Sequence, residues 1–457
     1  MRRRPSLFVF VSAVAVSLAA TFAAREAHAC GGCFTVTQSR NPTQVTSHRM
    51  ALSISTEQTT LWDQIAYVGE PEEFAWVLPI RGQVAVGLSS DLLFSQLDAL
   101  TAVQIKSPTV YCSSGGSGGS VDPCGFSGTK AAATGGGGFS TDESEGGPVE
   151  VLAQEVVGPY ETVQLSSDDP LALRGWLDSH GYEIPPDIEP VIDAYVGEDF
   201  DFLALRLVPG ASVDSMRPVR ITTPGASPSL PLRMVAAGTG ASTAISLFIV
   251  AEGGYVPANL PWGTISEADL VWDFDAKRSN YSELREAYFD SYPTGAWLNE
   301  ATFAIGPWEF NGVIDTAVNA PADSGYGDAS GAGAEAEAQA DIGALLYGVD
   351  AGSMVVTRLN AELTREGLEA DLTLEGGTMA VLPELQATEY TGNPCLGTGF
   401  ACSDGNNGNG NGIIDGDDDG DSSTAGCNCG STAPVGAPAA ALLLGLGFAA
   451  RLRRRRR

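Results

Sequence analysis

Residues 200–251 read FDFLALRLVPGASVDSMRPVRITTPGASPSLPLRMVAAGTGASTAISLFIVA, and this stretch decides the fold class. It holds four apolar runs of strand length, separated by segments that contain glycine, proline and serine. No helical pattern lies between the runs, so the alternation of a βαβ protein is not expected. The stretch predicts consecutive strands at 200–208, 217–222, 230–237 and 243–251.

Alternating apolar residues predict further strands on both sides of this stretch. Met50, Leu52 and Ile54 alternate with other residues in 45–54, and 59–68 follows across a short turn, which indicates a hairpin. The other segments expected to be strands are 72–80, the two halves of 149–166 around Gly158, 353–363 and 368–375.

Apolar residues at helical spacing predict a few helices among the strands. One helix follows Ser90 or Asp91, either of which can cap its N-terminus. Another begins at Pro170, behind Asp168 or Asp169. Further helices are expected at 187–198, 283–292 and 341–347. This mixture predicts an α+β fold with β-rich antiparallel sheets and a few packed helices.

Two glycine-rich segments interrupt the predicted domain, which spans 30–394. Segments 113–148 and 319–339 contain few large apolar residues and cannot bury a core. We therefore expect both to be mobile loops.

The N-terminus has the pattern of a secretory signal. Arg2 to Arg4 precede an apolar stretch at 6–24, and Ala27-His28-Ala29 is a small-x-small cleavage site. The pattern predicts a signal peptide at 1–29 that is cut after Ala29. Because Cys30 follows the cut, a lipoprotein signal is the alternative, although Ala27 is smaller than that signal prefers.

The C-terminus has the pattern of a cell-surface sorting tail at 430–457. Cys427 and Cys429 precede an uncharged segment, and the chain ends in Arg451 and Arg453–Arg457. Arginines resist crossing a bilayer and stay on the cytoplasmic side. The apolar part is short against the ~20 residues of a stable span. We therefore expect export to the cell envelope or outer surface, with membrane anchoring at least in the precursor and processing at Cys427 or Cys429.

The charge of the chain restricts its partners. The formal net charge is −31, and the two termini hold ten of the 25 basic residues. A surface this acidic repels nucleic acid and anionic lipid, so neither is expected as a ligand. The expected partners are the membrane, through the tail, and the export and sorting machinery. An envelope protein or a polysaccharide is a further possible class of partner.

The cysteines occur in close pairs, which in an exported protein predicts local disulfides. Cys30 and Cys33 also match the C-x-x-C redox pattern, but redox chemistry needs the first cysteine at a helix N-terminus. Zinc is excluded because the pairs are far apart. The expected disulfides are Cys30–Cys33, Cys112–Cys124 and Cys395–Cys402.

One segment has the spacing of a calcium loop. Residues 404–421 place oxygen ligands at alternate positions, with Gly412 at the sharp turn. Asparagine at the first position and aspartate at the last weaken the match. The alternative is a solvated acidic stalk over 395–429. No cofactor other than calcium is expected, and the expected calcium ligands are Asn407, Asn409, Asn411, Ile413, Asp415 and Asp418.

No catalytic residues are predicted. The chain after residue 29 contains two histidines, His48 and His180, and neither lies in H-E-x-x-H or beside an evident nucleophile. The seven tryptophans could form a carbohydrate platform, but most fit apolar patterns of the core. A structural or interaction protein of the envelope is favoured. An exported hydrolase with an unrecognised active site and a calcium-dependent adhesin are the alternatives.

Several segments resemble a known bacterial family. ACGGCF (29–34), EEFAWVLPI (72–80), EVVGPYETV (155–163), LRGWLDSHGYEIP (173–185) and VTRLNAEL (356–363), with 216–240, resemble the domain of unknown function 2330. The resemblance covers about 30–395 and implies an exported protein with a cysteine-rich start and no assigned catalytic residues. Segment 427–457 is similar to the myxobacterial C-terminal sorting tail, which implies cleavage and retention at the surface.

Overall fold

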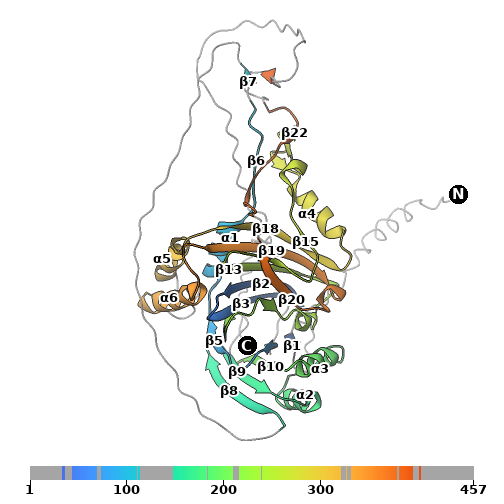
Figure 1. Ribbon diagram of the computed structural model, residues 1–457, viewed down its shortest axis with the longest axis vertical. Helices are drawn as coiled ribbons and strands as arrows, with labels where there is room; N and C mark the ends of the chain where they lie inside the picture. Colours follow the sequence, from blue (N-terminus) through green and yellow to red (C-terminus); the bar gives the residue numbers. More distant parts are fainter. Residues whose placement is uncertain are drawn as a thin grey trace, which may run out of the picture.

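The computed structural model of the chain has a β-rich centre with helices on its outer sides (Figure 1). The signal segment, the predicted calcium loop and the sorting tail lie outside the described residues. The structure describes residues 33–35, 44–68, 74–110, 112–113, 148–182, 184–208, 216–237, 239–320, 326, 331–377, 380–394 and 401–402.

Two sheets form the centre of the molecule. The larger sheet consists, in spatial order, of β15 (Trp262–Gly263), β18 (Gly295–Ala304), β19 (Met354–Thr364), β13 (Ser242–Glu252), β2 (Gln44–Ile54), β3 (Gln58–Val68), β11 (Val219–Pro224) and β5 (Ala85–Leu88). The smaller sheet consists of β1 (Cys33–Thr35), β4 (Phe74–Ile80), β10 (Asp201–Leu207), β9 (Tyr160–Ser166) and β8 (Glu150–Val157). Most neighbours are antiparallel, as expected, but β13 pairs in parallel with β2 and β15 with β18.

Both faces of the central strands are buried. Successive side chains of a strand point to opposite faces of the sheet. On β13, Ile245, Leu247 and Ile249 belong to the core between the two sheets, whereas Phe248 and Val250 belong to a second core on the outer face. Residues 247–251 form a continuous apolar run because this part of the strand is covered on both sides.

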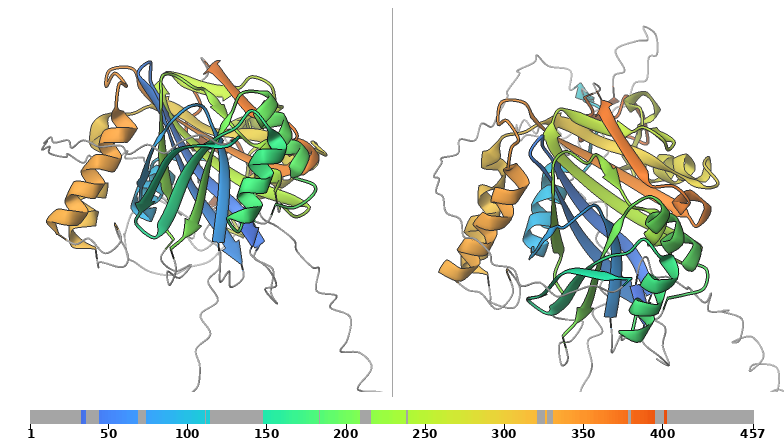
Figure 2. Two further views of the ribbon diagram at one scale, coloured as in Figure 1. Left: turned by 90° about the horizontal axis from the view of Figure 1, so that it is seen from below. Right: turned by 60° about the horizontal axis from the view of Figure 1, so that its bottom comes forward.

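Helices cover the outer faces of the two sheets, which gives four layers (Figure 2). The outer core of the larger sheet contains residues of α1 (Asp91–Thr101), α5 (Asn311–Asn319) and α6 (Ala332–Leu346). The outer core of the smaller sheet contains residues of α2 (Pro170–Ser179) and α3 (Glu189–Gly197). The predicted α+β class is confirmed.

The remaining elements are short. Helix α4 (Tyr281–Asp290) packs against a small sheet through Tyr281 and Leu284. The small sheets are β12 (Ser229–Leu230), β20 (Leu372–Gly377) and β14 (Gly254–Pro257); β17 (Arg278–Ser279), β16 (Val271–Asp273) and β22 (Glu389–Thr391); β21 (Glu384–Gln386) and β6 (Gln104–Lys106); and β23 (Ala401–Cys402) and β7 (Cys112–Ser113). The one-turn helices are η2 (Arg233–Ala236), η3 (Glu267–Asp269), η4 (Pro307–Phe310) and η5 (Glu366–Leu368).

The structure selects one cap from each predicted pair. The Ser90 side chain accepts a hydrogen bond from the backbone N–H of Leu92 at the start of α1. The Asp169 side chain accepts from the N–H of Leu171 at the start of α2, where Pro170 is the first helical residue. Both caps satisfy N–H groups that have no partner within the helix.

Two predicted segments are wrong. Most of 230–237 is not a strand, because Arg233–Ala236 form the one-turn helix η2. This turn places Met234 in one core and Val235 in another, so consecutive apolar residues are buried and periodicity cannot distinguish the turn from a buried strand.

The predicted loop at 319–339 is wrong from residue 332 onward, because α6 begins at Ala332. Its buried face there consists of Ala334 and Ala338, so the helix packs through small residues instead of large ones. Alanine is the best helix former. Sequence analysis predicts no element at β18, where Asn299 and Glu300 interrupt the apolar run, or at α5, although its apolar residues have helical spacing.

Candidate functional site

A buried histidine and aspartate lie between the two sheets. His48 on β2 is 1% exposed and Asp63 on β3 is 4% exposed. Their Nδ1 and Oδ1 atoms are 3.3 Å apart, and His48 Nε2 has no hydrogen-bond partner among the described residues. Buried polar groups usually carry partners because an unpaired one costs free energy. His48 Nε2 is therefore one of the buried polar atoms of this core for which the described residues supply no partner, as is Trp297 Nε1.

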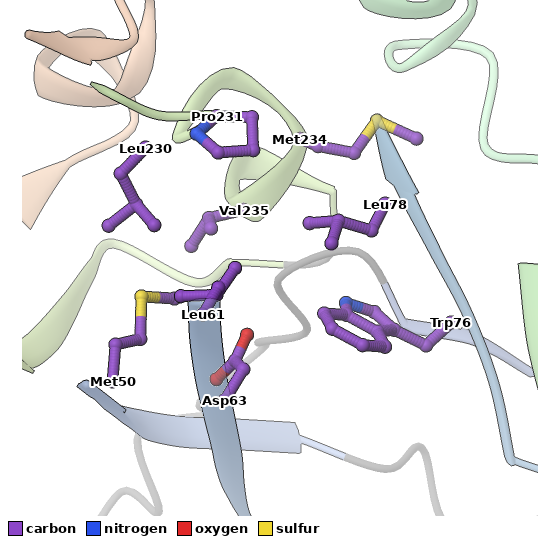
Figure 3. A pocket seen from close by; sticks show the side chains of 9 residues that line it. All are labelled: Met50, Leu61, Asp63, Trp76, Leu78, Leu230, Pro231, Met234 and Val235. Atoms are coloured by element: carbon purple, nitrogen blue, oxygen red, sulfur yellow. The ribbon is translucent and has the colours of Figure 1, made fainter. Parts of the chain in front are cut away.

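Asp63 points into a small apolar cavity (Figure 3). The cavity has a volume of about 10 Å³, which is room for about one water molecule. A second cavity of about 20 Å³ shares Asp63 and Trp76 with the first and reaches Arg217. The other residues that line the first cavity are Met50, Leu61, Leu78, Leu230, Pro231, Met234 and Val235.

The His48–Asp63 pair contains two parts of a hydrolytic triad but lacks the third. In such a triad the acid orients the histidine, and the other ring nitrogen takes a proton from a nucleophile. No described hydroxyl or thiol group bonds to Nε2 of His48, and both side chains are enclosed by the core. The pair therefore forms a buried polar contact that connects β2 with β3.

A cleft of about 240 Å³ continues from this cavity to the surface and shares Leu61 and Leu78 with it. Its mouth is charged. Arg233 donates to Glu198 at 2.8 Å and to Asp371 at 2.8 Å. The hydrogen bond from Arg233 lowers the pKa of Glu198. Arg81 also lines the cleft, so the two carboxylates are balanced by two arginines and the formal charges of the cleft sum to zero.

A larger hollow, a groove of about 620 Å³, lies between strands β5 and β8 and is here named the β5–β8 groove. Glu57 and Glu155 supply negative charge, and none of the described lining residues is lysine or arginine. Burial raises the pKa of Glu155. The groove is lined by Glu57, Gln58, Gln83, Val84, Ala85, Val86, Leu152, Ala153, Gln154, Glu155, Gln164, Thr222, Pro224 and Tyr347.

Specific contacts hold the strands beside this groove. The Gln164 side chain accepts from the backbone N–H of Val84 at 2.9 Å and donates to its carbonyl at 2.8 Å. Outside the groove lining, Leu88 of β5 lies against Gly158, which has a φ of +55° in the turn between β8 and β9. A side chain at 158 would meet Leu88 at 2.3 Å, so the turn requires glycine.

A fully buried carboxylate holds α6 to the larger sheet. Asp341 accepts hydrogen bonds from Trp62 Nε1 at 2.7 Å, Ser89 Oγ at 2.5 Å and Tyr326 OH at 3.0 Å. Arg220 Nη1 lies 3.1 Å from it. Burial raises the pKa of Asp341, whereas Arg220 and the hydrogen bonds favour its charged form. Every contact joins α6 to another part of the fold, so this carboxylate is structural.

The residues predicted as sites lie mostly outside the described part of the chain. This is true of all six calcium ligands, of Ala29, Cys427 and Cys429, and of Cys30, Cys124 and Cys395. Within the described residues no group of three or more His, Cys, Asp or Glu side chains is placed to hold a metal. The calcium site and the processing site stay predictions.

The backbone register suggests a different partner for one cysteine. β23 pairs antiparallel with β7, and this register puts Cys402 directly opposite Cys112. Residues opposite each other in an antiparallel pair have Cα atoms about 4.5–5.5 Å apart, within the range for a disulfide. We therefore expect peptide mapping of the isolated protein to find Cys112 joined to Cys402. Finding Cys112 joined to Cys124 would restore the pairing predicted from sequence spacing.

Sequence analysis missed the two inner polar residues, although a signal was present. His48 has the same strand parity as Met50 and Leu52, and Asp63 has the parity of Leu61. A polar residue at a core position marks a site that needs a partner. The β5–β8 groove had no such signal, because its walls come from segments far apart in the sequence.

These features define a four-layer α+β protein with an acidic groove between two strand edges. The chain matches the family described as an uncharacterized protein conserved in bacteria, DUF2330, over residues 26–290, and it belongs to that family. The match ends before β18 and β19, although both lie inside the larger sheet. No curated protein and no solved structure matches the chain. Among the described helices, none combines the length and apolarity needed to span a bilayer.

Proposed function

We propose that this chain is an exported, cell-surface-anchored binding protein of the bacterial envelope, with its ligand in the β5–β8 groove. The groove carries the proposal, because its volume of about 620 Å³ lies within the range typical of ligand pockets. It also presents amides and carboxylates that could orient a ligand. The N-terminal signal pattern and the C-terminal tail pattern support the location.

The two alternative functions have less support. A hydrolase that uses His48 as its base would need a nucleophile at Nε2 of that residue, and no described residue supplies one. A calcium-dependent adhesin would depend on residues 407–418, which lie outside the described part of the chain. The binding role is therefore the function that the described geometry favours.

Filling the groove tests the binding role. Ala153 lines the groove, and Ala153→Trp would place an indole in it. We expect this variant to bind washed envelopes of the source bacterium at least about tenfold more weakly than the wild-type protein. Leu171→Trp is the matched control, since Leu171 is 70% exposed on α2, outside the groove lining. Equal envelope binding by all three proteins would contradict the proposal.

Replacing the tail cysteines tests the location. We expect Cys427→Ser combined with Cys429→Ser to leave an uncut precursor in the membrane fraction, since either cysteine could be the processing point. Intact mass of the protein from fractionated cells reports both cuts and any attached lipid. If the wild-type protein from cells still ends in Arg457, processing is wrong and 430–450 acts as a permanent anchor.

A further inference from the structure

One wall of the β5–β8 groove is the edge of β8, and the other combines the start of β5 with Thr222 and Pro224 of the neighbouring strand β11. Residues 83–86 on one wall are consecutive in sequence, and so are residues 152–155 on the other. Because successive side chains of a strand point to opposite faces, a sheet face would contribute only every second residue. Residues 152–155 line the groove consecutively because it lies beside the edge of β8, where the pairing register with β9 also shifts between Val151 and Ala153.

These two edges have unused backbone hydrogen-bonding groups. β5 ends the larger sheet and pairs with β11, and β8 ends the smaller sheet and pairs with β9. Neither strand has a second partner strand among the described residues. In an antiparallel pair, alternate residues direct their N–H and C=O groups away from the partner. Each edge therefore offers donors and acceptors to an added strand.

One side chain already bonds as an added strand would. The amide of Gln164 both accepts from and donates to the backbone of Val84, one residue before β5. A side-chain amide has the same donor and acceptor as a peptide group. The groove thus contains one built amide-to-backbone contact, on the side of β5 and opposite β8.

The charge of the groove selects among extended ligands. Glu57 stands near the β2–β3 turn and Glu155 on β8, and no described lining residue balances them with a positive charge. The whole chain carries a formal charge of −31. An extended ligand with cationic groups would therefore be attracted, whereas an acidic one would be repelled.

We infer that the ligand of the β5–β8 groove is an extended peptide segment with basic side chains, which adds as a strand to the free edge of β8. β8 is the longer edge, with eight residues against four in β5. Main-chain hydrogen bonds give affinity in this mode, and contacts of alternate side chains give specificity. The inference rests on the proposed function, because it names the ligand class of the same groove.

Blocked peptides of eight residues, as long as β8, test this inference on the mature protein. Calorimetry is expected to detect binding of an alternating Lys-Val peptide and none of the matching Glu-Val peptide. N-methylation of alternate amides keeps the side chains but removes donors for the strand edge. We expect this change to weaken binding at least about tenfold. Equal binding of the methylated and unmethylated peptides would overturn the strand-addition geometry.

Groove variants separate this inference from the proposed function. Ala153→Trp and Ala85→Trp fill the groove from its two walls and should each abolish peptide binding, whereas Leu171→Trp should not. Circular dichroism identifies a variant that fails to fold, and peptide binding by the other wall variant then tests the inference.

A neutral glucan oligosaccharide is the competing probe. If it binds in the groove and the peptides do not, the peptide inference is wrong but the groove function stands. If the groove variants keep full envelope binding, both fail.

Discussion

Replacing Asp341 with alanine is expected to lower the free energy of unfolding by about 3–5 kcal/mol. The variant leaves the side chains of Trp62, Ser89 and Tyr326 without their acceptor and removes the partner of Arg220. Each buried polar group left unpaired costs free energy on its own. Urea unfolding of the purified protein measures the loss. A loss of this size is a large share of a typical stability of about 5–15 kcal/mol.

Two further variants test whether the buried contacts of Asp341 cause this loss of stability. Glu337 lies on the same helix and pairs with Arg217 at 2.8 Å, but its side chain is 45% exposed. Glu337→Ala should therefore cost no more than about 1 kcal/mol. Asp341→Asn keeps an oxygen acceptor and should cost less than Asp341→Ala. If Glu337→Ala and Asp341→Ala destabilise equally, the buried contacts of Asp341 are not what holds α6.

The Asp341→Ala substitution is also expected to affect binding in the β5–β8 groove. Tyr347 directly follows α6 and lines the β5–β8 groove. Loosening α6 should move this side chain, so Asp341→Ala should also weaken envelope binding under conditions in which it remains folded. Glu337→Ala should leave binding unchanged.

Replacing His48 with leucine is expected to lower the free energy of unfolding by about 3 kcal/mol. The substitution leaves the Asp63 carboxylate in an apolar cavity without its side-chain partner. Asp63→Leu should also destabilise, because His48 would then lack a partner at both ring nitrogens. Urea unfolding of the two single variants measures both effects.

The double variant decides whether the pair acts as a unit. Replacing both residues with leucine removes the polar groups together, and such exchanges in a core are often neutral or stabilising. We expect the double variant to be more stable than either single variant, with a coupling energy of about 1–3 kcal/mol. Additive losses would show that the 3.3 Å contact contributes nothing of its own.

The sequence by itself determined the type and place of most elements. Alternating apolar residues located β2 and β3 as a hairpin, and the pattern at Pro170 located the start of α2. These predictions succeed because they depend on residues close together in the chain, where strand alternation and helix capping act. The segments quoted from the chain also identified the family, and the match over 26–290 confirms it.

Only the tertiary structure decided which elements meet. β13 pairs in parallel with β2, although neither segment contains a signal that predicts this pairing. The alanine-rich start of α6 becomes a core helix because the larger sheet covers its small side chains. Local periodicity reports that a face is buried, but not what buries it.

The sites depend most on these distant pairings. His48 and Asp63 were visible as polar residues at core positions, but the register of β2 with β3 brings them together. The β5–β8 groove exists because each of two separate sheets ends at one of its walls. An edge is a property of the completed sheet, since it consists of hydrogen-bonding groups for which the fold provides no neighbouring strand.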